Sequence, residues 1–169
     1  RPIEYPVRAP KDADAMFDVL TYEKGASVLR MLEQHIGPAV FRDGVRDYLR
    51  AHAYGNADTK DLWVSLGTAA EQPVPELMDG WIFQPGYPLV SARMDGTSEL
   101  VLTQQRFAYL PHHESSDQLW QIPVQIRIET SETTEHRRLL LTGPEKRVPL
   151  PSSVRRLLIN EGGHGFYRV

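Results

Sequence analysis

A tyrosine, a glutamate and a lysine stand side by side at residues 22–24, inside the stretch FDVLTYEKG. Their side chains place a phenol, a carboxylate and an ammonium group next to one another. A single tripeptide of this kind is a weak motif. From the residue types alone it indicates the start of a helix, with Glu23 near the helix N-terminus and Tyr22 half buried in a core. The apolar residues of this stretch recur at helical spacing and predict one helix from residue 17 to residue 37: Leu20, Val28, Leu32 and Ile36.

Histidines are the other candidates for chemistry, and none of them lies in an H-E-x-x-H motif, which places two metal ligands on one helical face. The neighbours His112 and His113 fall in a polar loop, where adjacent side chains diverge unless the loop folds around a metal. The chain has no cysteine, which excludes thiolate ligands and disulfides. It also has no G-x-S-x-G, Walker or dinucleotide-binding motif. The residues alone therefore predict no metal site and leave the function unassigned. The other histidines are His35, His52, His136 and His164.

The composition is that of an ordinary globular protein, with 169 residues, 41% hydrophobic and 24% charged. A net charge of −3 gives no reason to expect nucleic acid or an anionic membrane as a partner. No apolar run approaches the roughly 20 residues that a membrane-spanning helix needs. The lack of cysteine fits a reducing compartment, so we expect a cytoplasmic location. The chain opens at Arg1 in an irregular, proline-rich passage and is expected to be a piece of something longer.

Helical patterns cover residues 13–83, after an arm at residues 1–12 that is expected to be extended. Asp12 or Asp14 is expected to cap the first long helix. Gly37 and Pro38 predict its end and the start of a second helix over residues 38–53. Asp58 or Thr59 caps a third helix, and residues 75–83 form a short fourth one. Four helices over about 70 residues indicate antiparallel packing, with two aromatic side chains expected as packing anchors, Trp63 and Trp81.

The period changes at residues 84–88, where two prolines and a glycine mark a boundary. Beyond it, short alternating segments predict an antiparallel β-sandwich of about seven strands. One long strand over residues 119–130 points four isoleucine or valine side chains to one face, whereas Pro123 lies on the other face. Because proline cannot donate to the ladder, this strand is expected to be at an edge or bulged at that point. The fold class is therefore α+β. The other strands are expected at residues 89–94, 99–107, 136–142, 146–150, 155–160 and 165–169.

Three stretches carry a resemblance to a known family. FDVLTYEKGASVLRMLE resembles the helix that follows the zinc site in the aminopeptidase N family of zinc metallopeptidases, the gluzincin aminopeptidases. MDGWIFQPGYPLVSARM resembles the passage from their catalytic domain into a β-sandwich, and LINEGGHGFYRV resembles the last strand of that sandwich. The resemblance implies that residues 1–86 are the C-terminal helical part of a thermolysin-like catalytic domain. Residues 87–169 are then the β-sandwich domain.

The resemblance also implies a role for the tyrosine. Tyr22 matches the catalytic tyrosine of the family, whose hydroxyl stabilises the oxyanion that forms on the scissile carbonyl. Glu23, Lys24 and Gly25 belong to the same motif and are expected to support its position. The parent enzyme uses zinc and removes N-terminal residues from peptides, but the zinc ligands would precede Arg1. We therefore expect this chain to bind no metal, to be inactive alone, and to have the remainder of the catalytic domain as its partner.

A second hypothesis stays open from the sequence. The chain could be a free-standing, non-catalytic scaffold or protein-interaction module that has kept the aminopeptidase fold. The sequence preceding Arg1 discriminates the two, because only the peptidase needs H-E-x-x-H there. If part of the catalytic domain is absent, one helix face is expected to be exposed and to favour self-association, namely that of Val28, Met31 and Leu32.

Overall fold

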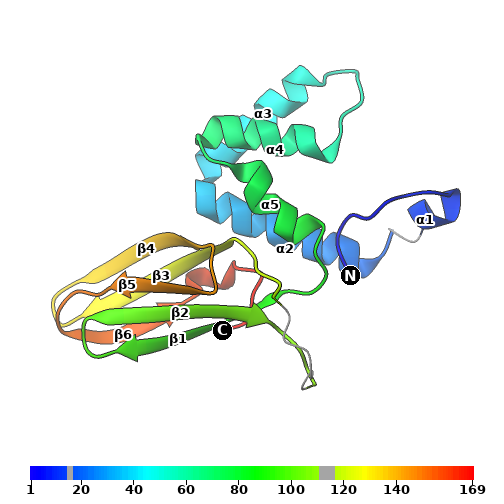
Figure 1. Cartoon of the computed structure of the whole chain (residues 1–169). Helices are drawn as coiled ribbons and strands as arrows, with labels where there is room; N and C mark the ends of the chain where they lie inside the picture. Colours follow the sequence, from blue (N-terminus) through cyan, green and yellow to red (C-terminus); the bar gives the residue numbers. More distant parts are fainter. Residues whose placement is uncertain (15–16, 111–116) are drawn as a thin grey trace.

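The computed structural model describes residues 1–14, 17–110 and 117–169. Within these residues, helices occupy the first half of the chain and antiparallel strands the second, as the α+β class predicts (Figure 1). The helices are α1 (Pro10–Asp14), α2 (Val19–Ile36), α3 (Pro38–Ala51), α4 (Thr59–Ala70) and α5 (Val74–Ile82). The strands are β1 (Pro88–Asp95), β2 (Glu99–Arg106), β3 (Ile122–Thr130), β4 (Thr134–Leu141), β5 (Glu145–Pro149) and β6 (Val154–Ile159), followed by a 3-10 turn, η1 (Glu161–Gly163).

The start of α2 differs from the prediction. Asp18 is its N-cap, and the Asp18 carboxylate accepts a hydrogen bond of 2.8 Å from the Thr21 amide. Asp12 instead accepts hydrogen bonds from the Arg8 and Ala9 amides at the short helix α1. This helix stands where the end of an extended arm was expected, and it lies apart from the other helices (Figure 1). The cap prediction at Asp12 or Asp14 is wrong because capping requires a side chain directly before the first helical turn.

The later helix boundaries confirm the predictions made from glycine, proline and capping residues. Gly37 ends α2 with φ 95°, a conformation that favours glycine, and its amide bonds the Glu33 carbonyl at 2.8 Å. Pro38 opens α3, where it needs no amide partner. Asp58 caps α4 in a reciprocal box with Asp61. Turn and cap chemistry therefore located these ends from the sequence alone.

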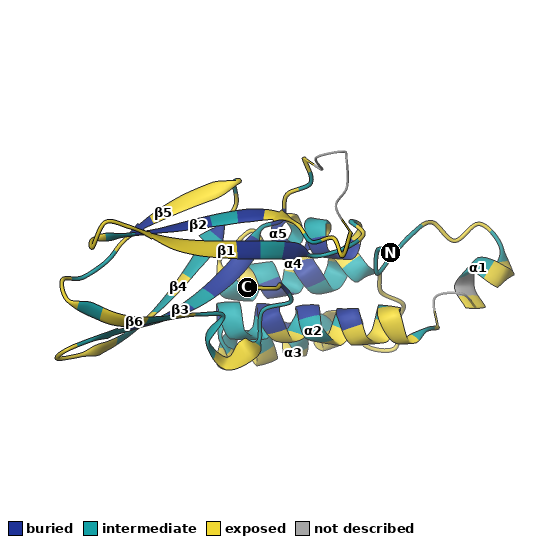
Figure 2. Cartoon of the chain, turned by 90° about the horizontal axis from the view of Figure 1, so that it is seen from below, coloured by how far each residue is buried: buried dark blue, intermediate teal, exposed yellow. Residues whose placement is uncertain are grey.

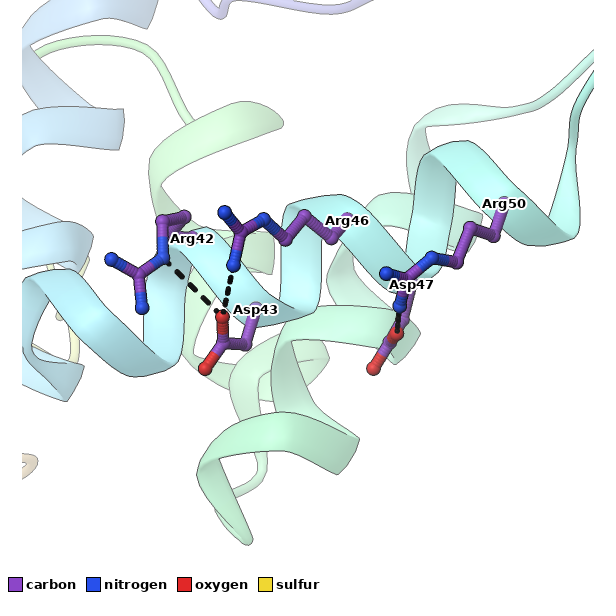
Figure 3. Close-up of polar contacts among 5 residues, drawn as sticks. All are labelled: Arg42, Asp43, Arg46, Asp47 and Arg50. Atoms are coloured by element: carbon purple, nitrogen blue, oxygen red, sulfur yellow. Dashed lines mark hydrogen bonds and ion pairs between the residues drawn. The ribbon is translucent and has the colours of Figure 1, made fainter.

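The polar face of α3 carries exposed ion pairs between neighbouring turns (Figure 3). Asp43 Oδ1 lies 3.3 Å from Arg42 Nε and 3.2 Å from Arg46 Nη1, and Asp47 Oδ1 lies 3.1 Å from Arg50 Nη1. All five side chains are more than half exposed. Such pairs typically contribute about 0–1 kcal/mol each, so this face is a solvated surface.

Two three-stranded antiparallel sheets form the sandwich, in the orders β1-β2-β5 and β4-β3-β6. The described residues hold six strands, fewer than the seven expected. Residues 165–169 make only a single parallel bridge, where Val90 N donates to Arg168 O at 2.7 Å and Arg168 N donates to Pro88 O at 3.0 Å. Positive φ angles at Gly162 and Gly163 turn the chain just before this stretch. That turn prevents a continuous ladder, so the seventh strand is a wrong prediction.

Pro123 lies where the sequence pattern places it. Its strand, β3, is the centre of its sheet and pairs with β4 along residues Ile122–Glu129. Its other neighbour, β6, pairs only from Ile126 to Thr130. At Pro123 the strand therefore has a partner on one side alone, with Leu140 opposite. The expectation of a local edge at Pro123 is confirmed.

One continuous core joins the helices to the sandwich. Val28, Met31 and Leu32 are 0–2% exposed, so the expectation that their face is open is wrong. The sandwich covers it, because α2 contacts β3 and the Phe166 amide lies 3.4 Å from Met31 Sδ. Figure 2 shows the buried positions along α2 on the side that faces the sandwich. The tryptophan anchors are confirmed as buried residues of this core: Trp63 and Trp81.

Candidate functional site

Tyr22 projects from the early turns of α2 and is 62% exposed. Its ring centroid lies 6.3 Å from that of Phe17, which is also exposed. Leu20, about two turns before Val28 in the predicted stripe, is exposed as well. The expectation from residue types that Tyr22 is half buried in a core is therefore wrong. Its phenol is directed outward, where a molecule approaching this end of α2 can reach it.

The N-terminal arm lies beside this end of the helix. Arg1 forms an ion pair with Asp18 and donates a hydrogen bond of 3.0 Å to Thr21 Oγ1. The amide of Thr21 and the guanidinium of Arg1 hold the pKa of the Asp18 carboxyl below its ordinary value. The Ile3 amide donates to the carbonyl of Ile82 at the end of α5. The arm therefore connects the first turn of α2 to the last turn of α5.

A cavity of about 910 Å³ opens between the arm and the helices. Residues 2–7 form most of its wall, with Thr21, Thr59 and Phe83 on the opposite side. One lining residue of the cavity, Thr21, directly precedes Tyr22 in the chain. Its wall is mostly proline, aliphatic and aromatic, with few groups that could act as an acid or a base.

The side chain of Lys24, unlike that of Tyr22, is buried. It is the first buried side chain within α2, with 9% of its surface exposed, and Lys24 Nζ donates a hydrogen bond of 3.1 Å to the Gln84 carbonyl. Burial lowers the pKa of this ammonium to about 8. Its charge therefore acts between α2 and the segment that leaves α5, and it is not presented to solvent beside Tyr22.

Glu23 and Gly25 complete the motif without joining the tyrosine in one cluster. Glu23 is exposed. A Cβ atom at Gly25 would meet no atom within 4 Å, so the packing of the described chain does not require glycine there. Consecutive residues of a helix point in directions about 100° apart. The structure accordingly spreads the four motif residues around α2 and brings no two of their functional groups together as a reacting pair.

The described residues do not fit a zinc ion. Among them, no group of three or more His, Cys, Asp or Glu side chains is placed to hold a metal. His35 is largely buried at the other end of α2, and burial lowers its pKa. His136 pairs with Glu161 on the sandwich, with 2.7 Å between Nδ1 and Oε2. The pair His112 and His113 lies outside the described residues. The expected absence of a metal from this chain stays a prediction.

None of the helices in residues 1–14, 17–110 and 117–169 combines the length and the apolar character that a bilayer crossing requires. The described residues thus combine a helix that carries an exposed tyrosine with a β-sandwich that shares one core with the helices.

Comparison with known proteins relates the chain to one family. Residues 1–81 match the family model described as "Peptidase family M1 domain". The chain is 40% identical over 163 residues to a probable M1 family aminopeptidase 1 of Encephalitozoon cuniculi, covering 96% of this chain and 18% of that protein. It is 36% identical to the leucyl aminopeptidase of Saccharolobus solfataricus, covering 99% of this chain and 20% of that protein. These similarities support a relationship of the chain to peptidase family M1, the aminopeptidase N family.

A puromycin-sensitive aminopeptidase of Caenorhabditis elegans is similar over the same extent, with 36% identity over 99% of this chain and 18% of that protein. The chain spans about one fifth of the length of the curated relatives it matches. The similarity continues through the sandwich, beyond the residues that the family model covers. Helical part and sandwich therefore resemble one continuous region of these relatives.

Two residues of this site were missed from the sequence. Asp18 was passed over as the cap, although an aspartate directly before an apolar helical run is a standard start signal. Gln84 accepts the bond from Lys24 through its backbone carbonyl. No side-chain pattern announces such a contact, and a lone glutamine before a proline is typical of a linker.

Proposed function

We propose that this chain is the part of a zinc-dependent aminopeptidase that supplies the hydroxyl of Tyr22 to the reaction. The observation that carries this assignment is the outward position of Tyr22 on the helix that matches the family. A tyrosine kept for packing is expected to resemble Tyr167, which is 8% exposed and whose pKa is raised by burial. Tyr22 is instead 62% exposed and contributes little to the core of this chain.

The chemistry assigned to Tyr22 is hydrogen-bond donation to a developing negative charge. Cleavage of a peptide bond by attack of water converts the planar carbonyl carbon to a tetrahedral one, and negative charge accumulates on its oxygen. A phenol hydroxyl fixed about 2.7–3.1 Å from that position stabilises the transition state more than the ground state. The described residues offer no zinc site, so this chain is assigned no part in holding the metal.

The division of the parent enzyme follows the predicted boundary. Residues 1–86 belong to the catalytic domain, and residues 87–169 form the β-sandwich domain. Peptides are the substrates, and a cytoplasmic location remains the expectation for the parent. The rest of the catalytic domain covers the exposed start of α2, where a contiguous set of apolar side chains is otherwise left in water. These side chains are 62–74% exposed: Phe17, Val19, Leu20 and Tyr22.

Two features near Tyr22 favour a covering element over open solvent. The exposed apolar side chains occupy positions that a solvated helix end would normally fill with polar groups. Gly25 lowers helix stability by about 1 kcal/mol relative to alanine, yet no atom of this chain needs the space. An element that packs closely on α2 beside Tyr22 explains both the apolar surface and the glycine.

Replacement of Tyr22 by phenylalanine in the intact aminopeptidase tests the assignment. The change removes one hydroxyl from an exposed ring, so folding is expected to be unchanged. Loss of one such donor typically slows turnover about 100- to 1,000-fold. Hydrolysis of a fluorogenic aminoacyl amide measures kcat, and the melting temperature confirms folding. Turnover equal to that of the unaltered enzyme would refute the role of Tyr22.

The isolated chain gives a second test with the same substrate. With zinc supplied, we expect no hydrolysis above the buffer rate, because the described residues do not assemble a metal site. Zinc-dependent turnover that disappears in Tyr22→Phe would show that this chain holds the metal itself. That result would overturn the proposal that the ligands lie elsewhere in the parent.

A further inference from the structure

The early turns of α2 have few attachments to the body of the molecule. Val19, Leu20, Tyr22 and Glu23 are all exposed, and the helix first enters the core at Lys24. Thr21 is tied to the arm through Arg1, and the arm itself is attached at Ile82. The part-buried hydrogen bond between Lys24 Nζ and the Gln84 carbonyl therefore attaches α2 to the end of α5 two residues after Tyr22. Whatever holds Gln84 in place also limits the movement of the tyrosine.

Gln84 is held by the sandwich. Its side-chain Nε2 donates a hydrogen bond of 3.2 Å to the carbonyl of Leu119, three residues before β3. Gln118 Nε2 donates to the Pro85 carbonyl at 3.1 Å in the opposite direction. Trp81 Nε1 donates to the Gln121 carbonyl at 2.9 Å and extends the contact back into α5. The segment that enters β3 is thus joined to the end of α5 and to the residues that follow it by side-chain-to-backbone bonds.

The surroundings of Gln84 are shaped to admit its side chain. Gly80 lies one turn earlier on α5, and a Cβ atom there would come within 2.9 Å of Gln84 Nε2 and 3.6 Å of Trp120 Cδ1. Trp120 is 1% exposed. A larger residue at position 80 would therefore displace the flexible amide before it moved the tryptophan. Glycine at position 80 leaves room for the amide to reach Leu119.

We propose that Gln84 and Lys24 form a joint through which the β-sandwich positions Tyr22. The joint runs from the Leu119 carbonyl to the Gln84 amide, and from the Gln84 carbonyl to the Lys24 ammonium. Gln84 and Lys24 are positioning residues, since neither is placed beside the phenol. The sandwich then has a part in catalysis beyond that of a spacer, a consequence that rests on the role proposed for Tyr22.

Amide hydrogen exchange in this chain tests the joint without any assay of activity. Lys24→Met keeps the apolar stem and removes the donor to Gln84, and Gln84→Met removes the donor to Leu119. Loss of one such hydrogen bond is expected to speed exchange of the Tyr22, Glu23 and Lys24 amides about threefold to tenfold. Exchange of the Met31 and Leu32 amides should stay unchanged, because these residues are held by the core. Lys24→Arg should restore slow exchange at the start of α2.

Two glycine substitutions provide a matched pair. Gly80→Ala displaces the Gln84 amide and should reproduce the effect of Gln84→Met on the early turns of α2. Gly25→Ala adds the same methyl group to a helix where it meets nothing within 4 Å, and it should leave exchange there unchanged or slower. Faster exchange along the whole of α2 in Lys24→Met would indicate general destabilisation and would overturn the joint. Unchanged exchange at Tyr22 in both methionine variants would also overturn it.

Kinetics in the intact aminopeptidase connect the joint to turnover. Gln84→Met is expected to lower kcat about threefold to tenfold with KM unchanged, because the donor is misplaced only for the transition state. An unchanged kcat would overturn the joint as a positioning device. The two proposals fail separately: turnover that is insensitive to Tyr22→Phe removes the role of the tyrosine, whereas the exchange experiment still decides whether the sandwich holds α2.

Discussion

The two ends of α2 lie in different surroundings. At its start, Val19, Leu20 and Tyr22 are 62–73% exposed, whereas Val28, Met31 and Leu32 further along are 0–2% exposed. The start is fixed by a cap, an arm and one buried ammonium. The rest is fixed by apolar packing in the core that α2 shares with the other helices and the sandwich. One helix thus combines a stable part with a part that is attached mainly by hydrogen bonds.

This division fits the role proposed for Tyr22, which requires the start of α2 to present a phenol in a fixed orientation. Apolar burial contributes about 25 cal/mol for each Å² removed from water and has no preferred direction. Hydrogen bonds contribute less energy each, but they specify orientation. Packing accordingly holds the end of α2 away from Tyr22, and hydrogen bonds orient the end that carries it. Stability and positioning are therefore separated along a single helix.

A leucine-to-alanine substitution at the buried part and at the exposed start of α2 should give the largest difference in unfolding free energy. Leu32→Ala removes a fully buried side chain and is expected to lower the free energy of unfolding by about 2–5 kcal/mol. Leu20→Ala removes one that is 63% exposed, and the expected change is within about 0.5 kcal/mol. Urea denaturation of the two variants measures both. Equal losses would mean that the start of α2 is covered in solution, for instance by a second copy of the chain.

Sequence patterns located most of the fold because its boundaries rest on local chemistry. Gly37, Pro38 and Asp58 have conformational or capping roles that act within a few residues. Pro123 marked a missing ladder partner because proline lacks an amide hydrogen. The exposure of the start of α2 was not predicted, for the opposite reason. Leu20 continues the helical period of Val28 and Leu32, but periodicity does not tell whether a partner lies opposite.

The site could be predicted only in part. Similarity to the family points to Tyr22, while the residue types alone suggested a tyrosine half buried in the core. The contact between Met31 and Phe166 depends on how two distant parts of the chain meet, and no local pattern encodes it. Gln84 escaped notice because its backbone carbonyl, and not its residue type, receives the Lys24 ammonium. Contacts to backbone carbonyls leave no trace in a sequence.

Removal of the cap should act on the exposed end of α2. Asp18→Ala deletes the acceptor for the Thr21 amide and the partner of Arg1, and we expect it to lower the unfolding free energy more than Asp14→Ala does. The pKa of Asp18 is lowered in the folded chain, so its contribution is present at neutral pH and is lost as pH falls through that folded pKa. Asp14→Ala is the matched control, because Asp14 caps no long helix. An equal effect of Asp14→Ala on urea denaturation would contradict the observed start of α2.

The buried ammonium of Lys24 should make stability rise with pH, in the same direction as Asp18 but in a separate, alkaline range. Burial lowers its pKa from 10.5 to about 8, so between these values the unfolded chain binds more protons than the folded one. The free energy of unfolding contributed by this group therefore rises as pH increases from about 8 toward 10.5, because deprotonation relieves the desolvation of the charge. The change is on the order of 1 kcal/mol, since part of the shift is screened by nearby solvent.

Lys24→Met removes this titration and keeps the apolar stem. The difference in unfolding free energy between the unaltered chain and the variant, measured in urea at pH 7 and at pH 10.5, should shift in favour of the unaltered chain at the higher pH. Other titrating groups contribute alike to both proteins and cancel in the difference. A difference that stays constant across this range would mean that the ammonium is solvated. The start of α2 would then lack the buried attachment that distinguishes it from a frayed helix end, and the contrast between the two ends would reduce to packing alone.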